Sequence, residues 1–244
     1  MNRRTIVLTV ALVLVLSSYL SATPIRVDFS VPNHPDAADI NYQQWTFGPC
    51  LSDSKAADIA IVTVTKVGDV GTNLKCDWWK DGMRPSFDAK LVNDGIMIPG
   101  ANKGGGKIEM RINGLPPGPH TMVTYHNAWQ DTKGVPFGKM NILVDGVMKV
   151  AGLAPSSRVK KNSDAAFACF EVTAQAGKDI VILFESDSTD TSRTNHNVVL
   201  NGFEIDTRTA PPATATPAPA TATPTSSGSS GNPMFRERSS SGTK

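Results

Sequence analysis

The sequence of 244 residues is poor in charged and aromatic residues, which make up 19% and 7% of it. Its formal charge is +2, from 24 Lys and Arg against 22 Asp and Glu. Six of the basic residues and one acidic residue fall in 1–22 and 208–244, which leaves 18 basic and 21 acidic residues, a net charge of −3, in 23–207. The basic surface that nucleic-acid binding requires is therefore not expected.

Motifs of catalysis are also missing. The sequence contains no G-x-S-x-G, H-E-x-x-H or C-x-x-C pattern. The run Gly104–Lys107 is followed by Ile108, where a phosphate-binding loop has Ser or Thr. His120 and His126 would share one face of a strand but lie about 20 Å apart, too far to share a metal ion. A pair of carboxylates for glycoside hydrolysis stays open, because a folded sheet can bring distant acids together.

Only three cysteines are present, so at most one disulfide can form and one thiol is left over. We predict a Cys50–Cys76 disulfide, since both residues lie in the less regular first third of the domain, where a cross-link would stabilise most. Cys169, within the apolar run Phe167–Phe170, is expected to be a small buried core residue.

The two ends differ from the middle in composition. Residues 1–22 combine a basic start, an apolar run and a small polar stretch, which is typical of a secretory signal peptide, with an uncleaved membrane anchor as the alternative. Residues 208–244 are rich in Ala, Pro and Thr and then in Ser and Gly, which predicts an extended linker or tail. The intervening residues 23–207 are long enough for one domain.

Period-two patterns dominate residues 23–207. Ile108, Met110 and Ile112 alternate with charged residues, which predicts a half-buried antiparallel strand. Turn signals such as Asp145-Gly146 and Asn201-Gly202 separate further β-rich runs, and no window favours a long amphipathic helix. Those runs are Ile25–Phe29, Ile59–Thr65, His120–His126, Met140–Val144, Phe167–Val172, Ile180–Glu185 and Val198–Ile205. The sequence therefore predicts an all-β, two-sheet antiparallel β-sandwich.

Aromatic and amide residues gather in loop-like segments of this predicted sandwich. Aromatic faces stack on the C–H faces of sugars, and amide and imidazole groups bind hydroxyls. Each residue also has a structural interpretation, since a Trp can belong to the core and an Asn to a turn. Tyr125 and His126 are neighbours on a strand and point to opposite faces, so at most one of them can face a given cleft. The candidate ligand contacts are Trp78, Trp79, Tyr125, His126, Asn127, Trp129, Asn195 and Asn197.

Four segments resemble a known group of domains: GPHTMVTY (118–125), MNILVDG (140–146), IVILF (180–184) and NVVLNGFEI (197–205). They are similar to the galactose-binding-like sandwiches of malectin and of family 6 and family 35 carbohydrate-binding modules. Residues 27–29 and 107–125 also resemble modules attached to bacterial pectin-degrading enzymes. The resemblance implies a jelly-roll arrangement of the two sheets.

The resemblance also implies a ligand site and a calcium ion. Asn195 or Asn197 matches an Asn before the final strand, and Tyr125 and Trp129 match an aromatic loop, whereas Trp78 and Trp79 have no counterpart. A structural calcium is implied where the first and last strands meet. The oxygen ligands available there would be Asp28, Glu204 and Asp206.

Together these features predict a secreted, non-catalytic carbohydrate-binding module that targets a partner enzyme or surface to a polysaccharide such as pectin or hemicellulose. A catalytic module could follow the C-terminal linker. One alternative is a polysaccharide lyase or hydrolase, a lyase using Tyr125, His126 and either Lys133 or Arg111 on a uronate. The other is a protein-binding adhesion module.

Overall fold

The computed structural model describes residues 24–68, 71–78, 87–100, 105–128, 137–192 and 195–209. Within these ranges the chain forms strands and short 3-10 turns and no α-helix. The described part of the chain therefore offers no helix with the length and hydrophobicity to cross a bilayer. The predicted signal peptide and all but the first two residues of the predicted linker lie outside the described residues.

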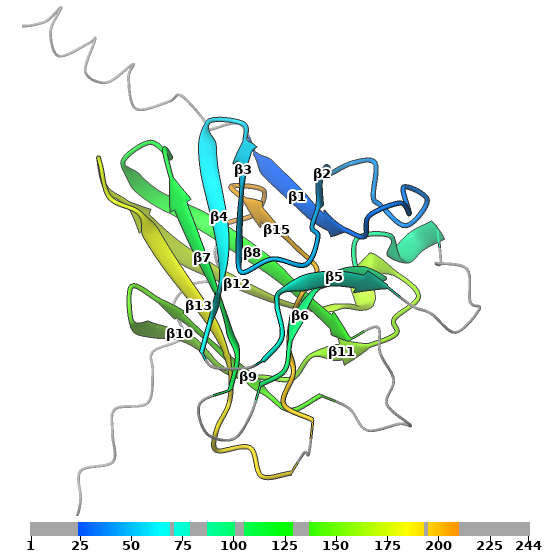
Figure 1. Ribbon diagram of the computed structural model, residues 1–244. Coiled ribbons are helices and arrows are strands. Elements are labelled where there is room, and N and C mark those ends of the chain that lie inside the picture. Colours follow the sequence, from blue (N-terminus) through cyan, green and yellow to red (C-terminus); the bar gives the residue numbers. More distant parts are fainter. Residues whose placement is uncertain are drawn as a thin grey trace, which may run out of the picture. The chain divides into compact units, whose positions relative to one another are not determined.

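Two six-stranded sheets pack face to face, with the sheet that contains β4, β7 and β13 in front of the other in Figure 1. Sheet I consists of β1 (Ile25–Ser30), β2 (Gln43–Thr46), β8 (Gly118–Ala128), β11 (Ser156–Ser157), β12 (Ala166–Ala174) and β15 (Gly202–Ile205). Sheet II consists of β3 (Ser52–Ala57), β4 (Ala60–Val67), β7 (Lys107–Asn113), β9 (Met140–Val144), β10 (Val147–Leu153) and β13 (Ile180–Ser186). A smaller sheet III contains β5 (Lys75–Trp78), β6 (Asp94–Ile98) and β14 (Val198–Leu200), and the 3-10 turns η2 (Phe87–Ala89) and η3 (Asn162–Asp164) lie in connections.

Strand alternation creates the core between the sheets. On β7 the apolar Ile108, Met110 and Ile112 are buried while the residues between them reach solvent. Phe29 of β1 and Phe203 of β15 bring their rings to a centroid distance of 6.0 Å. Burial of such side chains contributes about 1.5–3 kcal/mol each. The predicted all-β, two-sheet antiparallel sandwich is confirmed, with the β1–β2 and β8–β11 pairs as parallel exceptions, while the jelly-roll connectivity stays a prediction.

The segment predicted as one strand, Val198–Ile205, is divided at Asn201. Residues before it pair with β6 in sheet III, and residues after it pair with β1 and β8 in sheet I. The backbone N–H of Asn201 donates to the carbonyl of Tyr125 at 3.0 Å. Gly95 of β6 faces the division with a φ of +149°, and a Cβ there would lie 2.7 Å from the Leu200 carbonyl oxygen. Only glycine allows this close approach.

The predicted Cys50–Cys76 disulfide is not formed, because all three cysteines are free thiols. The backbone of Cys50 pairs with Leu74 rather than with Cys76. The Cys76 thiol is buried and donates to the carbonyl of Phe29, with 3.1 Å between Sγ and O. Burial also raises the pKa of this thiol well above its usual value, which disfavours the reactive thiolate. Cys169, expected in the core, is only half-buried and lies on the outer side of sheet I.

Alkylation of the purified protein tests this correction. Denatured without reductant, the chain should gain the mass of three alkyl groups, and reductant should change the melting temperature by less than about 1 °C, since no cross-link restricts the unfolded chain. Intact-mass spectrometry and a thermal melt measure the two quantities. A gain of only one alkyl group, with a melting temperature that falls on reduction, would show that a disulfide does form.

Candidate ligand-binding site

Among the described residues, those predicted to contact ligand lie in separate places. Trp78 pairs with Asp94 at the start of β6, whereas Val198, next to Asn197, pairs with Ile98 at its end. Four residues of strand separate the two places by about 14 Å. Trp78 is half-buried and stacks on His34 with 4.0 Å between ring centroids. Trp79 and Trp129 lie outside the described residues.

Asn195 and Asn197 shape a turn before β14. The side-chain oxygen of Asn195 accepts the backbone N–H of Asn197 at 3.2 Å, and its carbonyl accepts that of Gly138 at 2.6 Å. The side-chain amide of Asn197 contacts the sulfur of Met97 at 3.4 Å. Both Asn residues keep some solvent exposure. Their local role is therefore the turn, and ligand contact at this loop stays a prediction.

His126 and Asn127 are fully buried, contrary to the expectation that they contact ligand. The His126 ring lies within 2.8 Å of both the Val199 carbonyl and the Thr124 hydroxyl. Burial lowers the pKa of this imidazole to about 4, and the bond to Val199 only partly opposes that shift. Asn127 donates from its side chain to the Val92 carbonyl at 2.7 Å. Both side chains hold the fold together and do not reach the surface.

Tyr125 points to the opposite face of sheet I from His126, as strand alternation predicts. Its hydroxyl donates to Glu204 of β15 at 2.7 Å, and the side chain of Tyr42, from the loop before β2, donates to the same oxygen. Thr207 donates to the other Glu204 oxygen, and the guanidinium of Arg208 donates to the Tyr125 hydroxyl at 2.8 Å. Phe167 of β12 pairs with Tyr125 across the sheet. We call this group the Glu204 cluster: Tyr42, Tyr125, Phe167, Glu204, Thr207 and Arg208.

Glu204 is charged at the centre of this cluster. Burial alone would raise the pKa of its carboxyl, but the hydrogen bonds from Thr207, Tyr42 and Tyr125 and the charge of Arg208 lower the pKa below its usual value. Burial raises the pKa of Tyr125 to about 12, and the hydrogen bond to Glu204 adds to this effect. The same two causes raise the pKa of Tyr42 above its usual value. Both phenols therefore stay protonated as donors. The network fixes each side chain before any ligand arrives.

Phe167 and Arg208 form the accessible part of the cluster. Phe167 is 45% exposed, and the side chain of Arg208 is 43% exposed. The Arg208 guanidinium carbon lies 5.0 Å from the centroid of the Phe167 ring. The guanidinium thus lies over one face of the ring, and both side chains keep some surface in contact with solvent. Such a pair can hold the apolar face and the oxygens of one small polar ligand.

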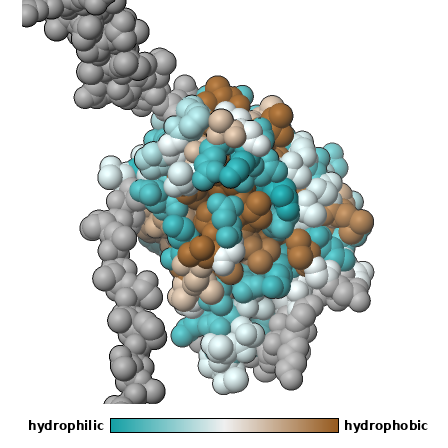
Figure 2. Space-filling view, turned by 90° about the vertical axis from the view of Figure 1, so that its left-hand side faces the viewer, coloured by the Kyte–Doolittle hydropathy of each residue, from teal (hydrophilic) through white to brown (hydrophobic). Residues whose placement is uncertain are grey.

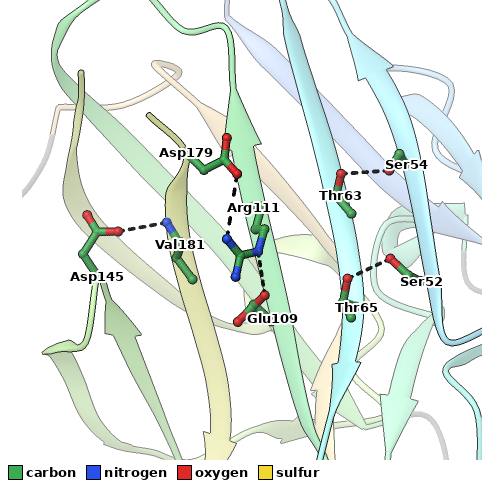
Figure 3. Close-up of polar contacts among 9 residues, drawn as sticks. All are labelled: Ser52, Ser54, Thr63, Thr65, Glu109, Arg111, Asp145, Asp179 and Val181. Carbon is green, nitrogen blue, oxygen red and sulfur yellow. Dashed lines mark hydrogen bonds and ion pairs between the residues drawn. The ribbon is translucent and has the colours of Figure 1, made fainter. Parts of the chain in front are cut away.

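Two other parts of the described surface differ in character from the Glu204 cluster. Figure 2 shows the side on the left of Figure 1, where apolar surface gathers inside a hydrophilic rim. On β10 the exposed apolar residues are the aliphatic Val147 and Met148. The outer face of sheet II carries hydroxyl and charged groups bonded to one another (Figure 3). These contacts join Ser52 to Thr65 at 2.7 Å, Ser54 to Thr63 at 2.8 Å and Arg111 to Glu109 at 2.8 Å.

The residues implied as calcium ligands do not fit a common ion. Asp28 accepts the backbone N–H of Asp39 at 2.8 Å, and Glu204 is used by the cluster described above. Asp206 accepts the backbone N–H of Thr121 at 3.0 Å and lies 2.7 Å from His120 Nδ1. Among the residues that the structure describes, no three His, Cys, Asp or Glu side chains lie close enough to hold a metal ion. These carboxylates serve hydrogen bonds within the protein, and calcium binding by them stays a prediction.

Comparisons with known proteins find similarity among solved structures, whereas no family model and no curated protein matches the chain. The ANX1 ectodomain from Arabidopsis thaliana aligns at 13% identity over 53% of this chain and 37% of its own length, with a TM-score of 0.41. The plant receptor-like kinase FER aligns at 11% sequence identity over 59% of this chain and 50% of its own length, with a TM-score of 0.39. This chain thus spans well under two thirds of either protein.

A family 35 carbohydrate binding module from Clostridium thermocellum aligns at 14% identity over 63% of this chain and 96% of the module, with a TM-score of 0.35. Family 35 is one of the families that the sequence of this chain resembles.

Because His126 is buried and its pKa is lowered, we expect the folded protein to lose stability in mild acid. The imidazole protonates below about pH 6.5 in the unfolded chain but only near pH 4 in the folded one, so its contribution is present above pH 6.5 and is lost as the pH falls to 4. The loss amounts to about 3 kcal/mol. Urea unfolding at pH 7 and pH 4.5 should show a smaller acid loss for His126→Gln than for the wild type. Equal losses in both proteins would contradict the prediction, and comparison with the variant cancels the other titrating groups.

Proposed function

We propose that this protein is a non-catalytic carbohydrate-binding module that acts outside the cell and contacts its glycan at Phe167 and Arg208. One observation carries the proposal. Tyr42, Trp78 and Phe167 are the aromatic side chains with accessible surface among residues whose side chains are described, and the fold brings Tyr42 and Phe167 to the Glu204 cluster. An aromatic surface beside fixed polar donors is the combination that a sugar ring requires.

In the proposed contact, two side chains bind different parts of the sugar. The part of the Phe167 ring that Arg208 leaves uncovered packs on the C–H face of a sugar. The guanidinium donors of Arg208 that face solvent bind the oxygens of the sugar. A guanidinium binds carboxylates in a two-pronged geometry, which favours an acidic polysaccharide such as pectin over a neutral one. A small open surface of this kind gives affinities of about micromolar to millimolar. The output is targeting, because tethering raises the local concentration of an attached partner.

The lyase alternative has weaker support in the described residues. A base that removes a proton near neutral pH needs a pKa near the working pH, whereas that of Tyr125 is raised to about 12. His126 is buried away from any substrate. Arg111 lies on β7 of sheet II, while Tyr125 is on β8 of sheet I. Lys133 lies outside the described residues.

Retention on immobilised polysaccharides tests the proposed function. Wild-type protein should be retained by at least one of pectin, xylan, mannan and β-glucan without releasing reducing ends or unsaturated product. Phe167→Ala and Arg208→Ala should each weaken binding about tenfold or more, equivalent to about 1.4 kcal/mol. Affinity gels and isothermal calorimetry measure the change.

Two further variants serve as controls. Met148→Ala, which removes an exposed apolar side chain from β10, should bind within twofold of the wild type, and melting curves should show that every variant folds. Trp78→Ala tests the separate aromatic stack with His34. A loss confined to Trp78→Ala would move the site there, retention by none of the glycans would favour the adhesion module, and product release would make the protein an enzyme.

A further inference from the structure

A small polar pocket lies at the hairpin turns that join β9 to β10 and β12 to β13. We call it the turn pocket. Its volume is about 260 Å³, and its lining consists of Asp145, Thr173, Gln175, Lys178 and Asp179. Pockets for drug-sized ligands occupy about 300–1,000 Å³, so this space suits one small ligand. None of the lining residues belongs to the Glu204 cluster.

Two tight turns fix the walls of the turn pocket. Asp145 and Gly146 have φ angles of +50° and +79°, which is the left-handed conformation of a two-residue hairpin turn. The Oδ1 atom of Asp145 also accepts the backbone N–H of Val181 on β13 at 3.0 Å (Figure 3). In the other turn, the backbone N–H of Lys178 donates to the Gln175 carbonyl at 3.1 Å. The backbone around the pocket is therefore set before a ligand arrives.

The charges around the turn pocket balance. Asp179 Oδ1 accepts the side-chain amide of Asn113 at 2.7 Å, and Asp179 Oδ2 lies 3.8 Å from the Arg111 guanidinium (Figure 3). The charge of Asp179 is thus offset by Arg111. Lys178 and Asp145 supply the other two charges of the lining, and these have opposite signs. The pocket therefore favours neither an anion nor a cation.

Three side chains of the turn pocket are available as hydrogen-bond partners. Thr173, Gln175 and Lys178 are exposed, and no hydrogen bond or ion pair within the described part of the chain involves their side chains. A hydroxyl both donates and accepts, an amide offers two N–H donors and an acceptor oxygen, and an ammonium offers three donors. Asp145 Oδ2 adds an acceptor. A neutral ligand with several hydroxyl groups matches this mixture, because each hydroxyl can donate and accept.

Strand geometry separates the turn pocket from the contact at Phe167 and Arg208. Thr173 and Phe167 are six residues apart on β12, so their Cα atoms lie about 20 Å from each other. An even spacing places both side chains on the same face of the strand, the one that leaves the core. A single sugar unit is too small to touch both of them.

We propose that the turn pocket is a second ligand site, which binds one neutral sugar unit. The choice of a sugar among neutral polyhydroxyl compounds rests on the proposed function, whereas the pocket itself includes neither Phe167 nor Arg208. Its lining has no aromatic ring and no guanidinium, so its preference for neutral ligands differs from that of the other contact. Two sites on one domain strengthen attachment to a polysaccharide beyond the affinity of either site.

Amide NMR of the isotope-labelled full chain tests the turn pocket. The neutral probes are glucose, galactose, mannose and xylose, and galacturonate is the acidic probe. At least one neutral sugar should shift the amide signals of Gly146 and Gly177 with a Kd in the millimolar range. Galacturonate should bind there no more tightly than galactose, because the lining is neutral overall. Gln175→Ala and Thr173→Val, which each remove a hydrogen-bond partner from an exposed position, should weaken binding about fivefold or more.

A matched variant and a variant of the other site serve as controls. Thr63→Val removes an outer hydroxyl that bonds to Ser54 on sheet II outside the pocket, and it should bind within twofold of the wild type. Phe167→Ala should keep the sugar-induced shifts of Gly146 and Gly177 while it weakens retention on polysaccharides. The turn pocket and the Phe167 contact can therefore fail separately.

Three results would overturn the turn pocket. The first is the absence of shifts at the two turn glycines with every neutral sugar, and the second is an affinity that neither Gln175→Ala nor Thr173→Val changes. The third is tighter binding of galacturonate than of every neutral sugar. If polysaccharides still retain the wild type, these results leave the proposed function intact. Shifts at the turn glycines in a protein that no polysaccharide retains would support the pocket and reject the contact at Phe167.

Discussion

The side-chain amide of Asn201 is the contact on which the rest of the domain depends. Its Oδ1 accepts the backbone N–H of Asn127 at 2.6 Å, and its Nδ2 donates to the carbonyls of Asp94 at 2.6 Å and Asn127 at 3.1 Å. One buried residue thus satisfies backbone groups of β6 and β8 where the last strand leaves sheet III for sheet I. Without these bonds the crossing would bury unpaired polar groups, at about 1–3 kcal/mol each. The positions of Asp94 and Glu204 follow from this crossing.

Glu204 and Asp28 show how differently buried carboxylates can be accommodated on one face of sheet I. Glu204 receives three hydroxyl donors and lies near a guanidinium, so its charge is balanced within the protein. Asp28 receives one backbone donor and a second carboxylate as a neighbour. The first arrangement is complete, whereas in the second the buried Oδ1 atom of Asp28 has no hydrogen-bond partner. The same sheet therefore contains one buried carboxylate that is fully hydrogen-bonded and one that is only partly hydrogen-bonded.

Many of the strands were predictable from the sequence, because burial of one face makes apolar and polar residues alternate along the strand. β9 matches its predicted range, and β1, β4, β8, β12 and β13 lie within two residues of theirs. The edge strand β3, with the sequence SDSKAA, was missed because little of it is buried. β10 was missed for a similar reason, since irregular pairing with β9 leaves most of it exposed. The division at Asn201 depends on tertiary hydrogen bonds that no local pattern reports.

The candidate site was less predictable, because it is assembled from residues that look ordinary in sequence. Arg208 was assigned to the linker, yet Glu204 and Tyr125 hold it against the sheet. A signal for Phe167 did exist: Phe167 and Phe170 are three residues apart on one strand, so they point to opposite faces, and only one can enter the core. Tyr125 and His126 follow the same rule. Strand alternation therefore shows that one of the two aromatic side chains leaves the core, and only the fold shows which one it is and which polar groups it meets.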